Sequence, residues 1–492
     1  MTHATTLEAP RPAPEAPTLM SRLSDWLNPI LVKEVRQAVH GREFNYSFSL
    51  SLLIGLIIAL HGSAYAEPGG ATGKGVFTAL TVCLGIVSLV VAPIGAFFAL
   101  NGERIEKTFD MVTLTALSCR AIVVGKLLAQ MVKLLTFFAA LSPFMAMSFL
   151  LGGVDLPTIL DSLLMLFLAS LWVCALCLFV STIGKSRGAA FALLGAVGAM
   201  MIPMVPGLLF VLFEGRGGGG FGFVFTASSW SASAIGLALW LVSLINLVSL
   251  TVSRIMSATD NGSTALRVGF LAQFLLVLGL LAWKHTTRGY GGLPEFVVVV
   301  ASLHLVAGAL FAVTEDLTLS RRVRRQLPKN RLLFCLSAMF QPGGGHGAIY
   351  TCVLSGLLIA AAAMAKLPGN GISMAVGLCC YVWFFSGVVT VACRQFMPHR
   401  TTPLLLRFAV PLTVAVGSLV PIVVMLLTRD PFERSIYSGR HIFNPFYTLA
   451  EWTDVVKSGW DLVVFVMGFV GLVAYLWLVI LGHRANASQG RT

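Results

Sequence analysis

Five polar residues stand inside or at the borders of long apolar runs, where burying them is costly enough to mark candidate functional positions. They are Lys133, Asp161, Asn246, His304 and Asp461. Such groups can relay protons, bind an ion or line a substrate path. His304 is the most interior of the five, although a hydrogen-bonded packing histidine is the more frequent role. We keep His304, Asp161 and Lys133 as candidate pathway residues.

Two short motifs that often carry chemistry are incomplete in this chain. The triplet at 184–186, Gly-Lys-Ser, is similar to the end of a phosphate-binding loop, but Phe179 stands where that loop needs a glycine. Cys174 and Cys177 are three residues apart, and no histidine or second pair stands nearby to complete a zinc site. We therefore predict that this chain has no catalytic, cofactor-binding or metal site of its own.

The elements that position these residues are long apolar runs. Hydrophobic residues make up 57% of the 492 residues and charged residues 11%, which excludes an ordinary soluble domain. A membrane span needs about 20 apolar residues, and a helix satisfies its backbone groups internally. The sequence predicts an all-α integral membrane protein with about twelve spans. The expected spans are 44–66, 76–100, 122–151, 157–184, 188–213, 230–253, 266–283, 296–317, 348–365, 371–392, 405–427 and 459–482.

Lysine and arginine gather in alternate loops, which predicts that both termini lie in the cytoplasm of a multi-pass protein of the cytoplasmic membrane. The net charge of +13 follows span ends and forms no stripe, so nucleic acid is not an expected partner. The basic loop around 321–331 is interpreted as an orientation determinant, with binding of anionic lipid as the alternative. Residues 1–23 are predicted to be a disordered leader, and the charged and aromatic outer loop 428–458 a solvated surface loop.

Two segments outside the spans have the pattern of amphipathic helices. In 24–42, Asn28 can cap a helix and Pro29 suits its first position. Its basic side should face lipid head groups, with the chain turning at Gly41 into the first span. In 103–118, apolar residues recur at helical spacing and the acidic residues at its start suit a helix dipole. The glycine-rich stretches 215–222 and 342–347 are expected to be flexible loops.

These two segments resemble motifs of the permeases of type-2 ATP-binding-cassette (ABC) exporters. Residues 28–37, Asn-Pro-Ile-Leu-Val-Lys-Glu-Val-Arg-Gln, are similar to the opening N-P-x-L-x-K-E-x-R-Q of that family. Residues 103–118 are similar to its signature E-R-x-x-G-T-L-E-x-L-L-x-x-T-P-L-S, which Arg120, Ile122, Gly125 and Lys126 continue. Lys107 replaces the usual glycine and Ala116 the usual proline, so this helix can begin and end differently.

The resemblance implies an elbow helix at 24–42 and a coupling helix at 103–118 that contacts a separate ATPase dimer. The elbow residues are then Asn28, Pro29, Lys33, Glu34, Arg36 and Gln37, and the coupling residues Glu103, Arg104, Glu106, Lys107, Thr108, Phe109, Asp110, Thr115, Leu117 and Ser118. ATP and Mg²⁺ would bind to that partner. Membrane lipid and a second permease chain, identical or different, are the other expected partners. The substrate stays unidentified.

The division into domains follows from the same resemblance. Residues 24–253 are predicted to form one six-span permease unit, and 254–492 a second six-span bundle that is a degenerate permease copy or an unrelated accessory bundle. Two other functions fit the composition: an ion- or proton-coupled secondary transporter, which needs a buried charge relay, and a membrane-embedded lipid-processing enzyme, which needs clustered polar groups. The small number of buried charges weighs against the secondary transporter.

Overall fold

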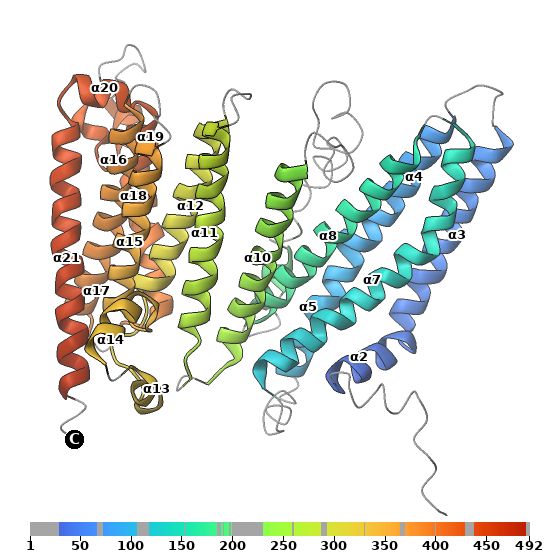
Figure 1. Cartoon of the computed structure of the whole chain (residues 1–492), viewed down its shortest axis with the longest axis horizontal. Helices are drawn as coiled ribbons and strands as arrows, with labels where there is room; N and C mark the ends of the chain where they lie inside the picture. Colours follow the sequence, from blue (N-terminus) through green and yellow to red (C-terminus); the bar gives the residue numbers. More distant parts are fainter. Residues whose placement is uncertain are drawn as a thin grey trace, which may run out of the picture. The chain divides into compact units, whose positions relative to one another are not determined.

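The computed structural model is mostly α-helical in the part of the chain that it describes (Figure 1). It describes residues 29–65, 72–105, 118–152, 154–184, 188–189, 191–195, 198, 230–257, 260–286, 293–328, 330–364, 370–398, 400–428 and 437–488. Within these ranges there is no strand, and nine helices are long and apolar enough to cross a membrane. The chain is therefore an all-α, multi-pass membrane protein, as the composition predicted.

Nine of the twelve expected spans correspond to these helices. Two others, 266–283 and 296–317, are the helices α11 (Ser263–Thr286) and α12 (Leu293–Val313), whose shorter apolar parts are Ser263–Gly279 and Val300–Val313. Most of the expected span 188–213 lies outside the described residues. The total of twelve and the side on which the termini lie therefore stay predictions.

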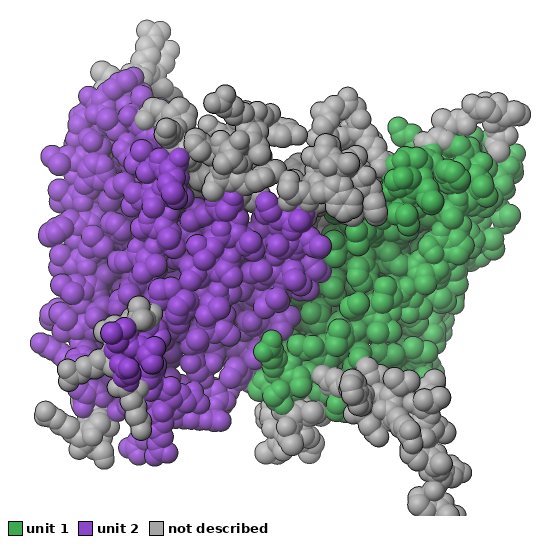
Figure 2. Space-filling view, in the orientation of Figure 1, with its two compact units in different colours: residues 1–225 green, residues 226–492 purple. Residues whose placement is uncertain are grey.

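The chain divides into two compact units, residues 1–225 and 226–492 (Figure 2). The division precedes helix α10 (Trp230–Ile255), whereas the predicted boundary at 253 falls in the last turn of that helix. Within the second unit α10 packs on α11, and the Asn246 amide donates a hydrogen bond to Gln273 Oε1 over 2.8 Å. This pairing gives the amide nitrogen of Asn246, a polar residue that the sequence placed inside a span, a partner on the neighbouring helix.

Unit 1 contains a short first helix and a bundle of longer ones. The short helix is α2 (Pro29–Val39), followed by α3 (Arg42–Ala64). The next span is one helix interrupted by a π-helical turn, made of α4 (Thr72–Ile86), η1 (Val87–Val91) and α5 (Ala92–Ile105). Two further helices follow, α7 (Cys119–Leu150) and α8 (Leu156–Ser181).

Small residues bring the helices of unit 1 close together. Ser51, Gly55, Ala59 and Gly62 form the buried face of α3. A Cβ atom at Gly55 would lie 2.8 Å from Leu141, and one at Gly62 would lie 2.2 Å from Val76. Membrane helices commonly pack through such stripes, because short side chains let two backbones approach.

Unit 2 begins with α10, α11 and α12 and continues with two short helices, α13 (Arg321–Gln326) and α14 (Arg331–Ser337), and a 3₁₀ turn, η2 (Ala338–Phe340). The long helix α15 (Gly344–Met364) follows. A second π-interrupted span consists of α16 (Gly371–Trp383), η3 (Phe384–Val388) and α17 (Val389–Phe396). Next come α18 (Pro403–Thr428), η4 (Gly439–His441), α19 (Pro445–Ala450), α20 (Trp452–Lys457) and α21 (Asp461–Ser488).

Two predictions for the loops of unit 2 are wrong. The stretch 342–347 is not a flexible loop, because α15 begins at Gly344 after a left-handed turn at Gly343 (φ +111°). The described part of 428–458 is folded rather than a solvated loop. Trp452 is 3% exposed there and its indole N–H donates to Ser373 Oγ over 2.9 Å. Burying aromatic rings against the ends of the spans outweighs the solvation of the neighbouring charges.

Candidate functional site

Helix α2 begins at Pro29 and has the amphipathic pattern predicted for the first segment. Ile30 is buried, whereas Lys33, Arg36 and Gln37 are exposed. The buried side packs on α7, so this short helix is joined to the bundle of unit 1 along one face. Asn28, its predicted cap, lies outside the described residues.

Glu34 points from α2 to a buried lysine on α7. The ammonium group of Lys126 lies 2.7 Å from Glu34 Oε1 and 3.0 Å from Glu103 Oε1, and it donates a third bond to the Ala99 carbonyl over 2.8 Å. Lys33 lies on the outer side, 3.6 Å from Glu103 Oε1. We name Lys33, Glu34, Glu103 and Lys126 the Lys126 cluster.

The Lys126 cluster is balanced in charge. The ammonium group donates hydrogen bonds to the Glu34 carboxylate and the Ala99 carbonyl and forms an ion pair with Glu103. The outer lysine brings the net charge of the four side chains to zero. Lys126 is 1% exposed, against 12% for Glu34 and 17% for Glu103. A buried cation is tolerated only with such partners. The cluster therefore ties α2, α5 and α7 together at one point.

The cluster stands directly before the segment predicted to couple to a partner. Glu103 is near the C-terminal end of α5, and Ser118 opens α7, where its hydroxyl accepts a hydrogen bond from the Ala121 N–H over 3.2 Å. Arg104 belongs to α5. The remaining predicted coupling residues lie outside the described part of the chain: Glu106, Lys107, Thr108, Phe109, Asp110, Thr115 and Leu117.

The three candidate pathway residues are divided between the two units. Lys133 is half-buried on α7 and Asp161 is buried on α8, both in unit 1. His304 is in unit 2, where its Nδ1 lies 2.9 Å from the Val300 carbonyl oxygen one turn earlier on α12. Two of the three candidates thus belong to unit 1 and one to unit 2.

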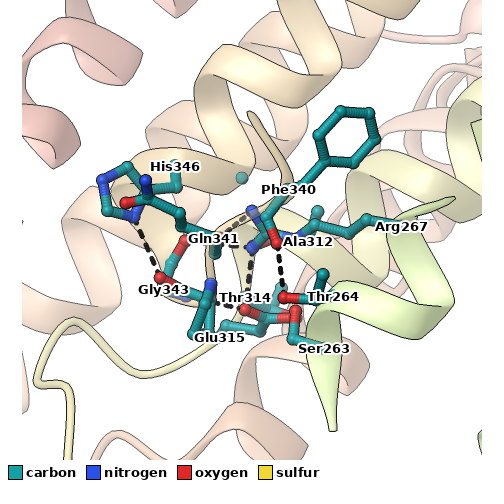
Figure 3. Close-up of polar contacts among 12 residues, drawn as sticks. Ser263, Thr264, Arg267, Ala312, Thr314, Glu315, Phe340, Gln341, Gly343 and His346 are labelled. Atoms are coloured by element: carbon teal, nitrogen blue, oxygen red, sulfur yellow. Dashed lines mark hydrogen bonds and ion pairs between the residues drawn. The ribbon is translucent and has the colours of Figure 1, made fainter. Parts of the chain in front are cut away.

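The structure reveals a second buried cation that the sequence analysis did not single out (Figure 3). Arg267 on α11 is 3% exposed and lies 2.7 Å from Glu315 Oε2. Its guanidinium also donates to four backbone carbonyls, those of Ala312, Met339, Gln341 and Gly343, at 2.5–3.4 Å. We name Arg267, Glu315 and these carbonyls the Arg267 cluster. It holds the turn before α15 against α11 and α12.

Glu315 is fixed by several further contacts. It accepts a hydrogen bond from the Ser263 hydroxyl over 2.5 Å and another from the Gly343 N–H over 2.8 Å, and the Arg394 guanidinium donates to its main-chain carbonyl. Burial raises the pKa of the next carboxyl, Asp316, above its ordinary value, and the neighbouring Arg394 and Arg407 offset this only in part. An isolated arginine and glutamate at facing ends of two apolar runs were the available sequence signal.

The cysteines and other potential ligands give no metal centre in the described residues. No group of three or more histidine, cysteine, aspartate or glutamate side chains is placed to hold a metal ion there. Cys174 and Cys177 are buried on α8 among apolar neighbours. The chain matches no family model, no curated protein and no solved structure.

Proposed function

We propose that this chain is the membrane-spanning permease of an ABC transporter, that it acts as an exporter, and that a separate cytoplasmic ATPase dimer drives it. The observation that carries the proposal is the Lys126 cluster. Lys33 and Glu34 belong to the first motif that resembles the permease family, Glu103 begins the second motif, and Lys126 continues it. Glu34 and Lys126 are 92 positions apart, and they meet with Glu103 at one point.

The contacts indicate how a movement would pass from the partner into the spans. A force on the segment after α5 reaches Glu103 first. Glu103 shares Lys126 with Glu34, so α5, α7 and α2 are held to one ammonium group. If any one of these three helices moves away from the others, a charged side chain is left without its partner in a poorly hydrated place. Breaking a buried ion pair in this way costs about 3–5 kcal/mol. The three helices therefore move together when ATP closes the partner dimer.

The test is co-purification of the full-length chain from its own membranes in mild detergent. We expect an ABC ATPase in stoichiometric amount, lost or weakened by Asp110→Ala. We expect Glu103→Gln to retain the ATPase but to lower the stimulation of its ATP hydrolysis by the chain about tenfold, equivalent to about 1.4 kcal/mol of coupling. Arg42→Gln is the matched control, because Arg42 is exposed at the start of α3 and is not part of the Lys126 cluster.

Two results would count against the permease. One is purification with lipid alone in several detergents. The other is transport or enzymatic activity that depends on His304, Asp161 or Asp461 and is unaffected by Glu103→Gln and Asp110→Ala, which would favour a secondary transporter or a lipid-processing enzyme. Thermal stability of each variant separates loss of coupling from loss of fold.

A further inference from the structure

Both units contain a π-helical turn at a comparable place, and these are the two in the described residues. In unit 1 the turn η1 follows the 15-residue helix α4, and in unit 2 the turn η3 follows the 13-residue helix α16. Each turn has five residues and a buried serine, Ser88 or Ser386. π-helical turns are rare inside α-helices, so two in matching positions indicate a shared origin.

The helices around these turns follow the same order. In unit 1 the order is a short helix, α2, a turn at Gly41, a span, the interrupted span, a span containing Pro143, and a final span. In unit 2, after α10 to α13, it is α14 with η2, a turn at Gly343, α15, the interrupted span, a span containing Pro411 and Pro421, and α21, with the short helices η4, α19 and α20 inserted before α21. In each set the interrupted span packs on the last helix, α8 in unit 1 and α21 in unit 2.

The start of the proline-containing span is built alike in both sets. The Ser118 hydroxyl accepts from the Ala121 N–H, and the Thr402 hydroxyl accepts from the Leu405 N–H, each at 3.2 Å and three residues along. The sequence before each first span also corresponds, with Asn28-Pro29-Ile30-Leu31 in one and Asn330-Arg331-Leu332-Leu333 in the other. In the second, Asn330 Oδ1 accepts a hydrogen bond from the Leu332 N–H.

The connection before that span differs greatly between the two sets. In unit 1 the residues between α5 and α7 are 106–118, whereas in unit 2 those between α17 and α18 are 397–402. Met397 donates its N–H to the Cys393 carbonyl, and its own carbonyl accepts from Arg400 and Thr401. Residues 397–402 therefore form a turn. This connection is too short for a three-turn helix, which needs about 11 residues.

We infer that residues 330–488 repeat residues 28–181 in the same orientation across the membrane, and that the repeat has no partner-docking helix. Each chain then offers one contact to an ATPase, and a dimeric ATPase engages two copies of this chain. The statement about the ATPase rests on the proposed function, whereas the repeat does not. In this repeat, α14 of unit 2 corresponds to α2, the predicted elbow helix of unit 1.

The orientation of the repeat is tested by labelling single cysteines with a membrane-impermeant maleimide in a background free of the nine native cysteines. Ser118→Cys and Thr402→Cys should react from one side, and Tyr65→Cys and Met364→Cys from the other. Labelling of Ser118→Cys and Thr402→Cys from opposite sides would overturn the repeat. Reporter fusions truncated after residues 118 and 402 in the native sequence give the same information if the cysteine-free chain does not fold.

The number of docking contacts is tested by native mass spectrometry of the full-length chain with the ATPase that co-purifies. We expect two chains with two ATPase subunits. One chain with two ATPase subunits, or one chain paired with a different permease, would overturn the inference. If no ATPase is present the proposed function fails, and the labelling still decides whether the chain contains a parallel repeat.

Discussion

The Lys126 cluster of unit 1 and the Arg267 cluster of unit 2 each fasten a short non-spanning segment to a bundle through one buried cation. Lys126 is held by two side-chain carboxylates and one carbonyl. Arg267 is held by four backbone carbonyls and one carboxylate. Carboxylates on separate helices can rotate and change partners, whereas carbonyls of a turn cannot. The Lys126 cluster is therefore suited to a joint, at which helices can shift, and the Arg267 cluster to a fixed anchor.

The choice of cation fits this difference. The planar guanidinium of arginine presents five donors in a fixed arrangement, which suits several carbonyls of one turn. The ammonium of lysine is a compact charge on a flexible stem, and it can follow carboxylates that move. Proposed coupling to a partner and structural anchoring are thus assigned to different units of the chain.

The largest expected effect is on Arg267. Replacing it in Arg267→Met leaves Glu315 and four carbonyls without their common donor, and we expect a loss of about 3–5 kcal/mol in the free energy of unfolding. The measurement is the thermal unfolding of the purified chain in detergent, followed by size-exclusion chromatography with fluorescence detection.

Arg267→Lys is the matched control for charge. It keeps the positive charge but has three donors, so we expect it to recover only a minor part of the loss. Full recovery by lysine would show that charge alone matters at this position and would remove the distinction drawn between the two clusters.

The next effect is on Lys126. Lys126→Met leaves Glu34 and Glu103 without their positive partner. Both carboxylates are more accessible to water than Lys126 itself. We therefore expect a loss of about 2–3 kcal/mol in the free energy of unfolding, below the usual cost of breaking a fully buried pair. The triple variant Lys126→Met/Glu34→Gln/Glu103→Gln removes the unpaired charges and should regain most of that loss. Thermal unfolding measures both. A triple variant as unstable as Lys126→Met would indicate a packing role for the lysine stem instead of a charge joint.

The same two clusters show how far the sequence could be read. Hydropathy predicted the helices that carry them, and helical spacing and Pro29 predicted the start of α2, because both signals are local. The contact between Lys126 and Glu34 could not be predicted in this way, since 92 residues separate the partners and only the packing of α2 on α7 brings them together. A sequence motif identifies residues, but it does not show which of them are in contact in the folded chain.

Arg267 was missed for a different reason. Its partners are mostly main-chain carbonyls of 339–343, and a carbonyl has no identity in the sequence. The glycines around 343 suggested a flexible loop, although the turn there is held by the Arg267 cluster. The π-helical turns were also unpredicted, because Val87–Val91 and Phe384–Val388 are as apolar as the helices around them.

The smallest expected effect is on Asp316, which lies beside the Arg267 cluster. Its pKa is raised above 3.8 because burial disfavours the charged carboxylate. An acid with a raised folded-state pKa contributes stability below its unfolded pKa and loses it as the pH rises through the folded value. At pH 7 the charged Asp316 is therefore a net cost, and Asp316→Asn should stabilise the chain by less than about 1 kcal/mol.

The pH dependence distinguishes this charge effect from a change in packing. The difference in unfolding temperature between Asp316→Asn and the wild type should be greatest near neutral pH and shrink as the pH falls toward 3.8, where the aspartate becomes protonated. Differential scanning fluorimetry from pH 4 to 7 in one detergent measures it. A difference that is independent of pH would mean that the asparagine acts through hydrogen bonds. A destabilised variant at pH 7 would mean that the Asp316 carboxylate stabilises the fold through its attraction to Arg394 and Arg407.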